Sequence, residues 1–237
     1  MRGGHLWIGR RVRFARFLAQ LVWRRQHGAV ARRAPIQPID PVHPQPRHVS
    51  RAVSVLDAGG LVSYPTDTYY AIGCDLFQKK AIERMALLKR RDPHKPFAFL
   101  CGDLGEVARY AIVDNDRFRL LRRLLPGPYT VVLPATRLVP RTALTRQRAV
   151  GIRVPDAPVA TALVHGLGRP LATTSAALAD NEPLVQAADI QDQLGHGLDL
   201  ILDGGMTLNE PSTVIDLTGV QPVVLRQGKG RIEGVLA

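Results

Sequence analysis

Cysteine is scarce in this chain of 237 residues, and long apolar runs are missing from it. The two cysteines, Cys74 and Cys101, are too few for a disulfide framework and lack the paired spacing of zinc ligands. No run of eighteen apolar residues occurs, so no transmembrane helix is expected. We therefore expect a cytoplasmic protein whose two cysteines are buried thiols.

The motifs of common catalytic sites are also missing. The sequence has no G-x-x-x-x-G-K-[ST] loop, no G-x-G-x-x-G after a strand, no H-E-x-x-H and no G-x-S-x-G. A nucleotide site must therefore be built in another way, and neither a protein-held metal centre nor a serine hydrolase is expected. The seven histidines are scattered, which is typical of solvated side chains.

Positive charge is concentrated at one end of the chain. The formal net charge is +12, but residues 1–35 contain nine arginines and no acid, which leaves only +3 for residues 36–237. Five apolar residues of this tail recur at helical spacing between arginines, namely Phe14, Phe17, Leu18, Leu21 and Val22. Such a basic amphipathic pattern is typical of a membrane-surface helix, a nucleic-acid contact or an organellar transit peptide.

We favour a simpler interpretation of residues 1–35, either a disordered extension or a segment outside the working protein. No methionine occurs between Met1 and Met85, so a non-Met start near Val30 or Val42 would be overlooked in gene prediction. The proline-rich residues 35–46 should form an extended lead-in without helix. The sequence thus predicts a basic extension followed by a domain over residues 36–237.

Beyond the lead-in, helical and strand periodicities alternate. We expect helices over residues 47–57, 79–90, 114–125, 158–167 and 187–194, and another that begins after the capping Asp103. We expect strands over residues 61–64, 97–101, 129–133, 150–155, 171–175, 198–202, 212–217 and 222–225. This alternation, with consecutive strands at the end, predicts an α/β domain on a mixed sheet.

Residues 63–75 end an apolar run in hydroxyls, one carboxylate and paired aromatic residues. Two glycines end the preceding helix and Pro65 removes a ladder donor, so a short buried strand should deliver residues 66–70 to a loop. Gly73 would let the backbone turn or pass close to a ligand. We interpret the segment as a pocket rim; an ordinary turn between two core strands has the same local pattern.

Cationic and hydroxyl side chains lie at the ends of several expected elements. Lys89 and Arg91 follow a helix, where cations complement the helix dipole or form a clamp for phosphate or carboxylate. Arg153 ends an apolar strand, and a charge there must be paired or bind an anion. Residues 173–175 end another strand, either at a ligand-binding edge or in a hydroxyl-bonded turn.

Eight short motifs follow one another between Pro65 and Gly228. They are P-T-D-T-x-Y-x-I-G, K-x-R, P-G-P-Y-T, R-V-P, T-S-A, D-G-G, P-S-T-V-I-D and L-R-Q-G. In this order they resemble the YrdC/YciO family of threonylcarbamoyl-AMP synthase-like proteins. The H-P-Q-P-R lead-in and Cys74 are more similar to the YciO branch.

The resemblance implies a single α/β domain with a twisted mixed sheet and a concave basic cavity. In the enzymatic members this cavity binds ATP, L-threonine and bicarbonate and makes threonylcarbamoyl-AMP for the modification of adenosine 37 in tRNA. A divalent metal, expected to be magnesium, would bridge the phosphates. By position, the resemblance implies catalytic Lys89 and Arg91, substrate-binding Thr68, Tyr70 and Arg153, and nucleotide-binding Thr174, Ser175, Ser212 and Arg226.

One position departs from the family pattern. The synthases have S-x-N where this chain has Ser175, Ala176 and Ala177. Alanine offers no polar side-chain contact, and such a loss costs about 1–3 kcal/mol. The alternative to a synthase is a non-catalytic protein of the same fold that uses its concave basic face to bind double-stranded RNA or tRNA.

Overall fold

The computed structural model describes residues 33–90, 97–140, 143–144, 147–178 and 182–233. The expectations for Arg91 and for residues 1–32 of the basic tail lie outside the described residues. None of the helices in the described part has the length and apolar character that a membrane crossing requires.

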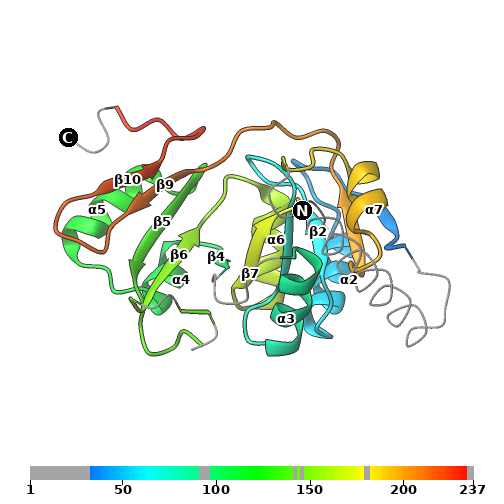
Figure 1. The fold of residues 1–237 in the computed structure, drawn as a ribbon, viewed down its shortest axis with the longest axis horizontal. Coiled ribbons are helices and arrows are strands. Elements are labelled where there is room, and N and C mark those ends of the chain that lie inside the picture. The colour runs from blue at the N-terminus through cyan, green and yellow to red at the C-terminus, as the bar shows by residue number, and fades with distance from the viewer. Residues whose placement is uncertain (1–32, 91–96, 141–142, 145–146, 179–181, 234–237) are drawn as a thin grey trace, which may run out of the picture. The chain divides into compact units, whose positions relative to one another are not determined.

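One mixed sheet of ten strands organises the described residues, in the order β1-β8-β2-β3-β7-β4-β6-β5-β9-β10 (Figure 1). The strands are β1 (Ile36–Pro38), β2 (Val62–Tyr64), β3 (Ala71–Asp75), β4 (Ala98–Leu100), β5 (Tyr129–Pro134), β6 (Ala149–Arg153), β7 (Leu171–Ser175), β8 (Leu200–Asp203), β9 (Thr213–Asp216) and β10 (Val223–Arg226). The sheet contains both parallel pairs, such as β4 with β6, and antiparallel pairs, such as β3 with β7. The predicted mixed α/β sheet is confirmed.

The predicted helices all form, with ends that differ by two residues at most. They are α2 (Pro46–Asp57), α3 (Lys79–Leu88), α4 (Leu104–Tyr110), α5 (Asn115–Leu124), α6 (Pro158–Leu167) and α7 (Ala187–Leu194). Prolines occupy the first turn of α2 and α6, where no backbone donor is needed. The carboxylates of Asp103 and Asp114 accept the N–H groups of Glu106 and Arg117 and cap α4 and α5.

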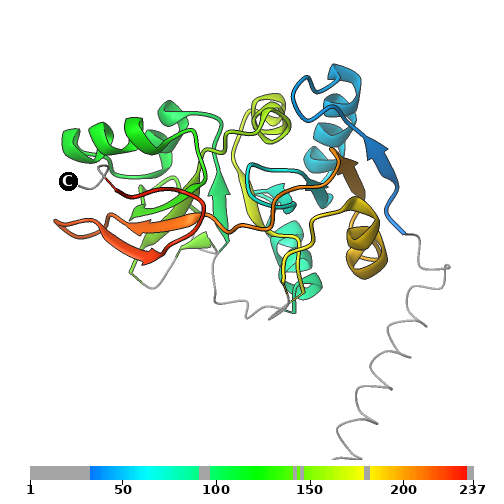
Figure 2. The same ribbon diagram turned by 90° about the horizontal axis from the view of Figure 1, so that it is seen from above.

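Two apolar clusters lie on the two faces of the sheet. One cluster contains Ile72 of β3, Phe99 of β4 and Ile152 of β6, with side chains of α3, α4, α5 and α7. The other contains Val62, Leu100 and the apolar sides of α2 and α6. In Figure 2, α2 and α7 accordingly lie on opposite sides of β8. On the second face, α2 and α6 leave the part over β4, β6, β5 and β9 without a covering helix, and the cavity described below opens there.

Two strands were not predicted. The extended lead-in contributes β1, which pairs in parallel with β8, because Ile36–Pro38 is too short and proline-rich to show a strand pattern. Residues Ala71–Asp75, expected partly as loop, form β3 between β2 and β7. The expectation that Gly73 marks a turn is wrong, because this glycine lies within β3 and pairs with Val62. It is not among the residues that line the cavity described below.

Gly73 makes room for a buried ring. A Cβ atom at this position would lie 2.8 Å from both Cε1 and the hydroxyl oxygen of Tyr64, which is fully buried. A Cβ atom on Gly151 of β6 would meet nothing closer than 3.6 Å. The two strand glycines therefore differ in whether a methyl group can be accommodated.

We predict that Gly73→Ala lowers the free energy of unfolding by about 1–3 kcal/mol, since the methyl group must displace the Tyr64 ring. The matched Gly151→Ala variant should be neutral or more stable by up to about 1 kcal/mol, because alanine restricts the unfolded chain. Urea unfolding followed by circular dichroism measures both. Equal effects of the two substitutions would contradict the packing argument.

Candidate functional site

A hydroxyl-bonded turn follows β2 and forms one wall of the site. The Thr66 hydroxyl donates to the Tyr69 carbonyl at 2.7 Å and accepts the Thr68 N–H at 3.2 Å. Because the Thr66 proton is used in this way, the contact of 3.0 Å between the two threonine hydroxyls requires Thr68 to donate. The lone pairs of Thr68 then remain available to accept from Arg153, whose Nη2 lies 3.2 Å away.

A buried ion pair fixes this turn to the end of β6. Arg153 Nη2 lies 2.7 Å from Asp67 Oδ1, and the two side chains are only 10% and 7% exposed. Asp67 Oδ2 accepts the backbone N–H of Asp156 at 3.2 Å, so both carboxylate oxygens are bonded. Arg153 Nε is buried without a hydrogen-bond partner in the described part of the chain. A charged group of this kind is stable in a protein only when its partners are in place.

A cavity of about 520 Å³ opens beside this pair. Its lining residues come from β3, β4, β5, β6, β7, β9, β10 and the connecting loops, and are Tyr69, Ala71, Phe97, Ala98, Thr130, Val132, Gly151, Arg153, Thr173, Thr174, Ser175, Ser212, Val214 and Arg226. Strand pairing aligns Ala98 with Thr173 and Val132 with Gly151 on one face of the sheet. Small residues thus make the floor, and aromatic, hydroxyl and guanidinium groups make the walls.

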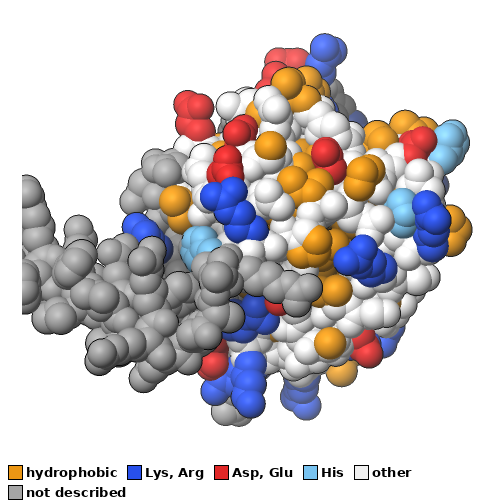
Figure 3. All heavy atoms as spheres, turned by 90° about the vertical axis from the view of Figure 1, so that its right-hand side faces the viewer, with side chains coloured by type: hydrophobic (Ala, Val, Ile, Leu, Met, Phe, Trp, Pro, Cys, Tyr) orange, Lys and Arg blue, Asp and Glu red, His pale blue; other side chains and the backbone are white. Residues whose placement is uncertain are grey.

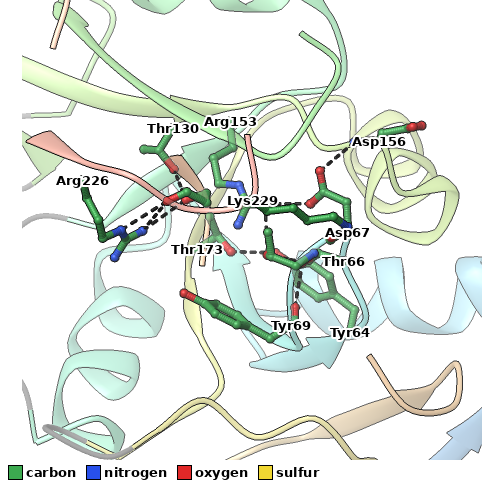
Figure 4. Close-up of polar contacts among 12 residues, drawn as sticks. Tyr64, Thr66, Asp67, Tyr69, Thr130, Arg153, Asp156, Thr173, Arg226 and Lys229 are labelled. Atoms are coloured by element: carbon green, nitrogen blue, oxygen red, sulfur yellow. Dashed lines mark hydrogen bonds and ion pairs between the residues drawn. The ribbon is translucent and has the colours of Figure 1, made fainter. Parts of the chain in front are cut away.

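Arg226 and two hydroxyls form the wall that β5, β9 and β10 contribute (Figure 4). Thr130 Oγ1 and Ser212 Oγ are 2.9 Å apart. Arg226 donates through Nε and Nη2 to the Ser212 carbonyl at 3.2 and 2.9 Å. The guanidinium is therefore held at the cavity by a neutral carbonyl, which leaves its positive charge without neutralisation from that contact.

A buried tyrosine supports the floor of the cavity. The Tyr64 hydroxyl lies 2.9 Å from Thr173 Oγ1 (Figure 4). Burial raises the pKa of Tyr64 well above its usual range, and the Thr173 contact and the charge of Arg153 oppose this only in part. The phenol therefore stays protonated, and the bond fixes the Thr173 side chain at the floor.

Five of the residues that were assigned by resemblance line the same cavity in the structure. They are Arg153, Thr174, Ser175, Ser212 and Arg226. Thr68 is fully buried beside Arg153 and is not among the lining residues. Lys89, also buried, donates from Nζ to the Ser175 carbonyl at 2.6 Å. Ala177 is 3% exposed and likewise outside the lining.

Tyr70, assigned to substrate binding by resemblance, contacts the D-G-G loop. Its hydroxyl donates to the Gly205 carbonyl at 2.7 Å and accepts the Gly204 N–H at 3.0 Å. It is fully buried and is not among the lining residues, whereas its neighbour Tyr69 is. The D-G-G loop is thereby tied to the end of the turn.

Sequence reasoning missed Tyr69, Phe97 and Lys229. Tyr69 adjoins the assigned Thr68 and Tyr70, and its place between them in the P-T-D-T-x-Y motif was the available signal. Lys229 directly follows the L-R-Q-G motif, and its Nζ donates to the Asp67 carbonyl at 2.5 Å. No local pattern joins residues 162 positions apart, so this contact depends on the fold.

Among the described residues, neither a reactive thiol nor a cluster of metal ligands lies at the cavity. Burial raises the pKa of Cys74 to about 12 and that of Cys101 well above its ordinary value. No group of three or more His, Cys, Asp and Glu side chains in the described ranges could hold a metal ion. The site can therefore bind, orient and neutralise charge, and it is suited to a ligand with anionic and hydroxyl-bonding groups.

The family model, the related sequences and the related structures all indicate the same protein family. A model of the Sua5/YciO/YrdC family, described as telomere recombination, matches residues 54–228. Escherichia coli YciO, called an uncharacterized protein, is 40% identical over 200 residues, which is 84% of this chain and 97% of that protein. Its crystal structure superimposes with a TM-score of 0.82 at 38% identity, covering 86% of this chain and all of YciO.

Two further relatives have more informative names. A threonylcarbamoyl-AMP synthase of Vibrio vulnificus is 31% identical over 185 residues, covering 76% of this chain and 98% of the synthase. The structure of P. abyssi Sua5 complexed with L-threonine superimposes with a TM-score of 0.78 at 28% identity. This match covers 82% of the chain described here and 58% of the Sua5 chain.

We predict that Asp67→Asn lowers the free energy of unfolding by about 3–5 kcal/mol, because it leaves the buried Arg153 charge without its counter-ion. The double variant Asp67→Asn with Arg153→Gln should lose less than Asp67→Asn alone. Asp116→Asn, which removes an acid from an exposed pair with Arg119, is the control and should change stability by about 0.5 kcal/mol or less. Denaturant unfolding distinguishes these cases, and additive losses in the double variant would contradict a coupled pair.

Proposed function

Because the chain belongs to the Sua5/YciO/YrdC family, we propose that it is a threonylcarbamoyl-AMP synthase-like nucleotidyltransferase. Its substrates are ATP, L-threonine and bicarbonate, and its product serves the threonylcarbamoyl modification of adenosine 37 in tRNA. A relative named as this synthase and the L-threonine complex of Sua5 support the choice of reaction. A cytoplasmic location fits two free cysteines in the described residues.

The observation that carries the proposal is the meeting of five assigned residues at one cavity. Arg226 provides positive charge, and Arg153, whose charge Asp67 balances, has in Nε a buried donor without a partner among the described residues. A carboxylate or carbamate oxygen would complete its hydrogen bonding. The hydroxyls of Thr174, Ser175 and Ser212 are suited to a nucleotide, and Lys89, which supports the end of β7, is suited to its phosphates.

The proposed reaction needs no covalent enzyme intermediate. A carbamate oxygen of N-carboxylated threonine attacks the α-phosphorus of ATP, an O–P bond forms, and the bond to pyrophosphate breaks. The residues of the cavity orient the two anions and neutralise their charge, which is how proteins assist phosphoryl chemistry. Because the described residues form no protein-only metal site, a divalent ion would be held mainly by phosphate oxygens, as is usual for magnesium.

We predict pyrophosphate release that requires ATP, L-threonine and bicarbonate together. Arg226→Met should reduce the rate at least tenfold, since it removes a cation that lines the cavity, while Arg119→Met on the exposed side of α5 should leave the rate unchanged. A coupled pyrophosphate assay with each substrate omitted in turn measures this. Release without threonine, or no release at all, would reject the synthase proposal.

A second candidate function, RNA binding, is favoured by the distribution of charge. Residues 104–148 contain nine arginines and three acids, a net charge of +6, although residues 36–237 together carry only +3. Arg119, Arg122 and Arg123 of α5 are exposed and do not line the cavity. The face over β1, α2 and α7 instead mixes acidic and basic side chains (Figure 3). An RNA backbone would therefore contact α5 rather than the cavity.

For this candidate we expect the combined variant Arg119→Gln, Arg122→Gln and Arg123→Gln to weaken binding of structured RNA. A plot of log affinity against log salt has a negative slope, and the magnitude of this slope should fall by about 2–3, which is one unit for each lost phosphate contact. The control removes three exposed cations elsewhere, with Arg47→Gln, Arg51→Gln and Lys80→Gln. Filter binding of the full chain at several salt concentrations measures both, and identical slopes would assign the affinity to another part of the chain.

A further inference from the structure

The C-terminal residues 227–231, here called the strap, cross the beginning of β9 and β5. The Lys229 N–H donates to the Pro211 carbonyl at 2.9 Å, and the Gly228 N–H donates to Thr213 Oγ1 at 3.0 Å. The Thr213 hydroxyl in turn donates to the Gly230 carbonyl at 2.6 Å, and the Tyr129 hydroxyl to the Arg231 carbonyl at 2.7 Å. The strap is therefore held at each of several consecutive residues.

Two glycines allow this close approach. A Cβ atom on Gly228 would lie 2.2 Å from the Pro211 carbonyl oxygen, and one on Gly230 would lie 2.3 Å from Cε1 of Tyr129. No other residue fits either position without movement of the neighbouring backbone or ring. The glycines on both sides of Lys229 thus determine where its side chain leaves the strap.

From there Lys229 reaches the turn after β2. Its Nζ donates to the Asp67 carbonyl at 2.5 Å, next to the contact between the Asp67 carboxylate and Arg153 (Figure 4). Asp67 is consequently held through its carboxylate by β6 and through its carbonyl by the strap. The strap side of the cavity carries Ser212 and Arg226, and the turn carries Tyr69.

Lys229 also brings a charge next to the Asp67–Arg153 pair, although it is not itself among the residues that line the cavity. Within the described ranges no carboxylate forms an ion pair with its ammonium group, which bonds a neutral carbonyl. The negative charge of Asp67 is already matched by Arg153. Lys229 therefore contributes a half-buried positive charge that none of the described carboxylates pairs with.

We propose that Lys229 is a positioning residue that ties the two walls of the cavity together and supplies a cation toward the anionic part of the ligand. The strap fixes the lysine, the lysine fixes the turn, and the turn places Tyr69 and the Asp67–Arg153 pair. The positioning role stands on the contacts alone. The identification of the anion as a nucleotide phosphate rests on the proposed function.

The first test is hydrogen exchange of the full chain, which needs no ligand. In Lys229→Met, peptides that cover residues 64–70 should exchange several-fold faster than in the wild type, because the carbonyl tie is lost. Lys229→Arg retains a donor and should keep most of the protection. Lys80→Met removes an equal charge from an exposed position of α3 and should leave these peptides unchanged.

The second test is titration with magnesium ATP. Lys229→Met should raise the Kd about tenfold at low salt, with a smaller difference at 1 M salt because salt screens a charge that is only half-buried. Lys229→Arg should recover most of the affinity, and Lys80→Met should match the wild type. If Lys229 only holds the turn and adds no charge, the Kd difference between Lys229→Met and the wild type should be the same at both salt concentrations. That result would reject the cationic role.

The outcomes separate this inference from the proposed function. If the wild type binds no ATP while Lys229→Met accelerates exchange, the proposed function fails and the positioning role stands. If the wild type binds ATP and Lys229→Met matches Lys80→Met in both exchange and Kd, the role of Lys229 is rejected and the proposed function is unaffected.

Discussion

The buried pair of Asp67 and Arg153 is the interaction on which the cavity depends. The two residues follow or end β2 and β6, which have β3, β7 and β4 between them in the sheet. At ordinary spacing those two strands are roughly 19 Å apart, so the turn after β2 must arch over the sheet face to bring a carboxylate to Arg153. Neither charge is stable away from water without the other. Burial of Arg153 therefore requires the turn after β2 to arch over the sheet and bring Asp67 to it.

Under the arch the sheet presents small side chains, and this is why a cavity remains. Ala98 and Gly151 lie where larger residues would fill the space, while α2 and α6 cover only the neighbouring strands. The polar groups around this floor are bonded mostly to carbonyls and to one another, as Arg226 is to Ser212 and Thr173 is to Tyr64. Such a lining is rigid before a ligand arrives, which reduces the entropy lost on binding.

Local pattern was enough for most of the fold. Helix ends marked by Asp103, Asp114 or a first-turn proline were predicted closely, because capping and proline effects act within a few residues. β1 and β3 were missed because one is three residues long and the other is buried throughout, without alternation. Arg153 was expected to need a partner, but Asp67 was not identified as that partner. The side chains of Tyr70 and Lys229 were beyond local reasoning, since their contacts join segments more than 130 residues apart.

The pairing of β1 with β8 sets a lower limit on the length of the functional polypeptide. Ala34 is 2% exposed and bonds Gly195 through its N–H, while the Ile39 N–H bonds the Asp203 carbonyl. Asp203 in turn begins the D-G-G loop that holds the Tyr70 hydroxyl. Translation from Val42 would remove the edge strand and expose the backbone of β8, whereas a start near Val30 would keep both.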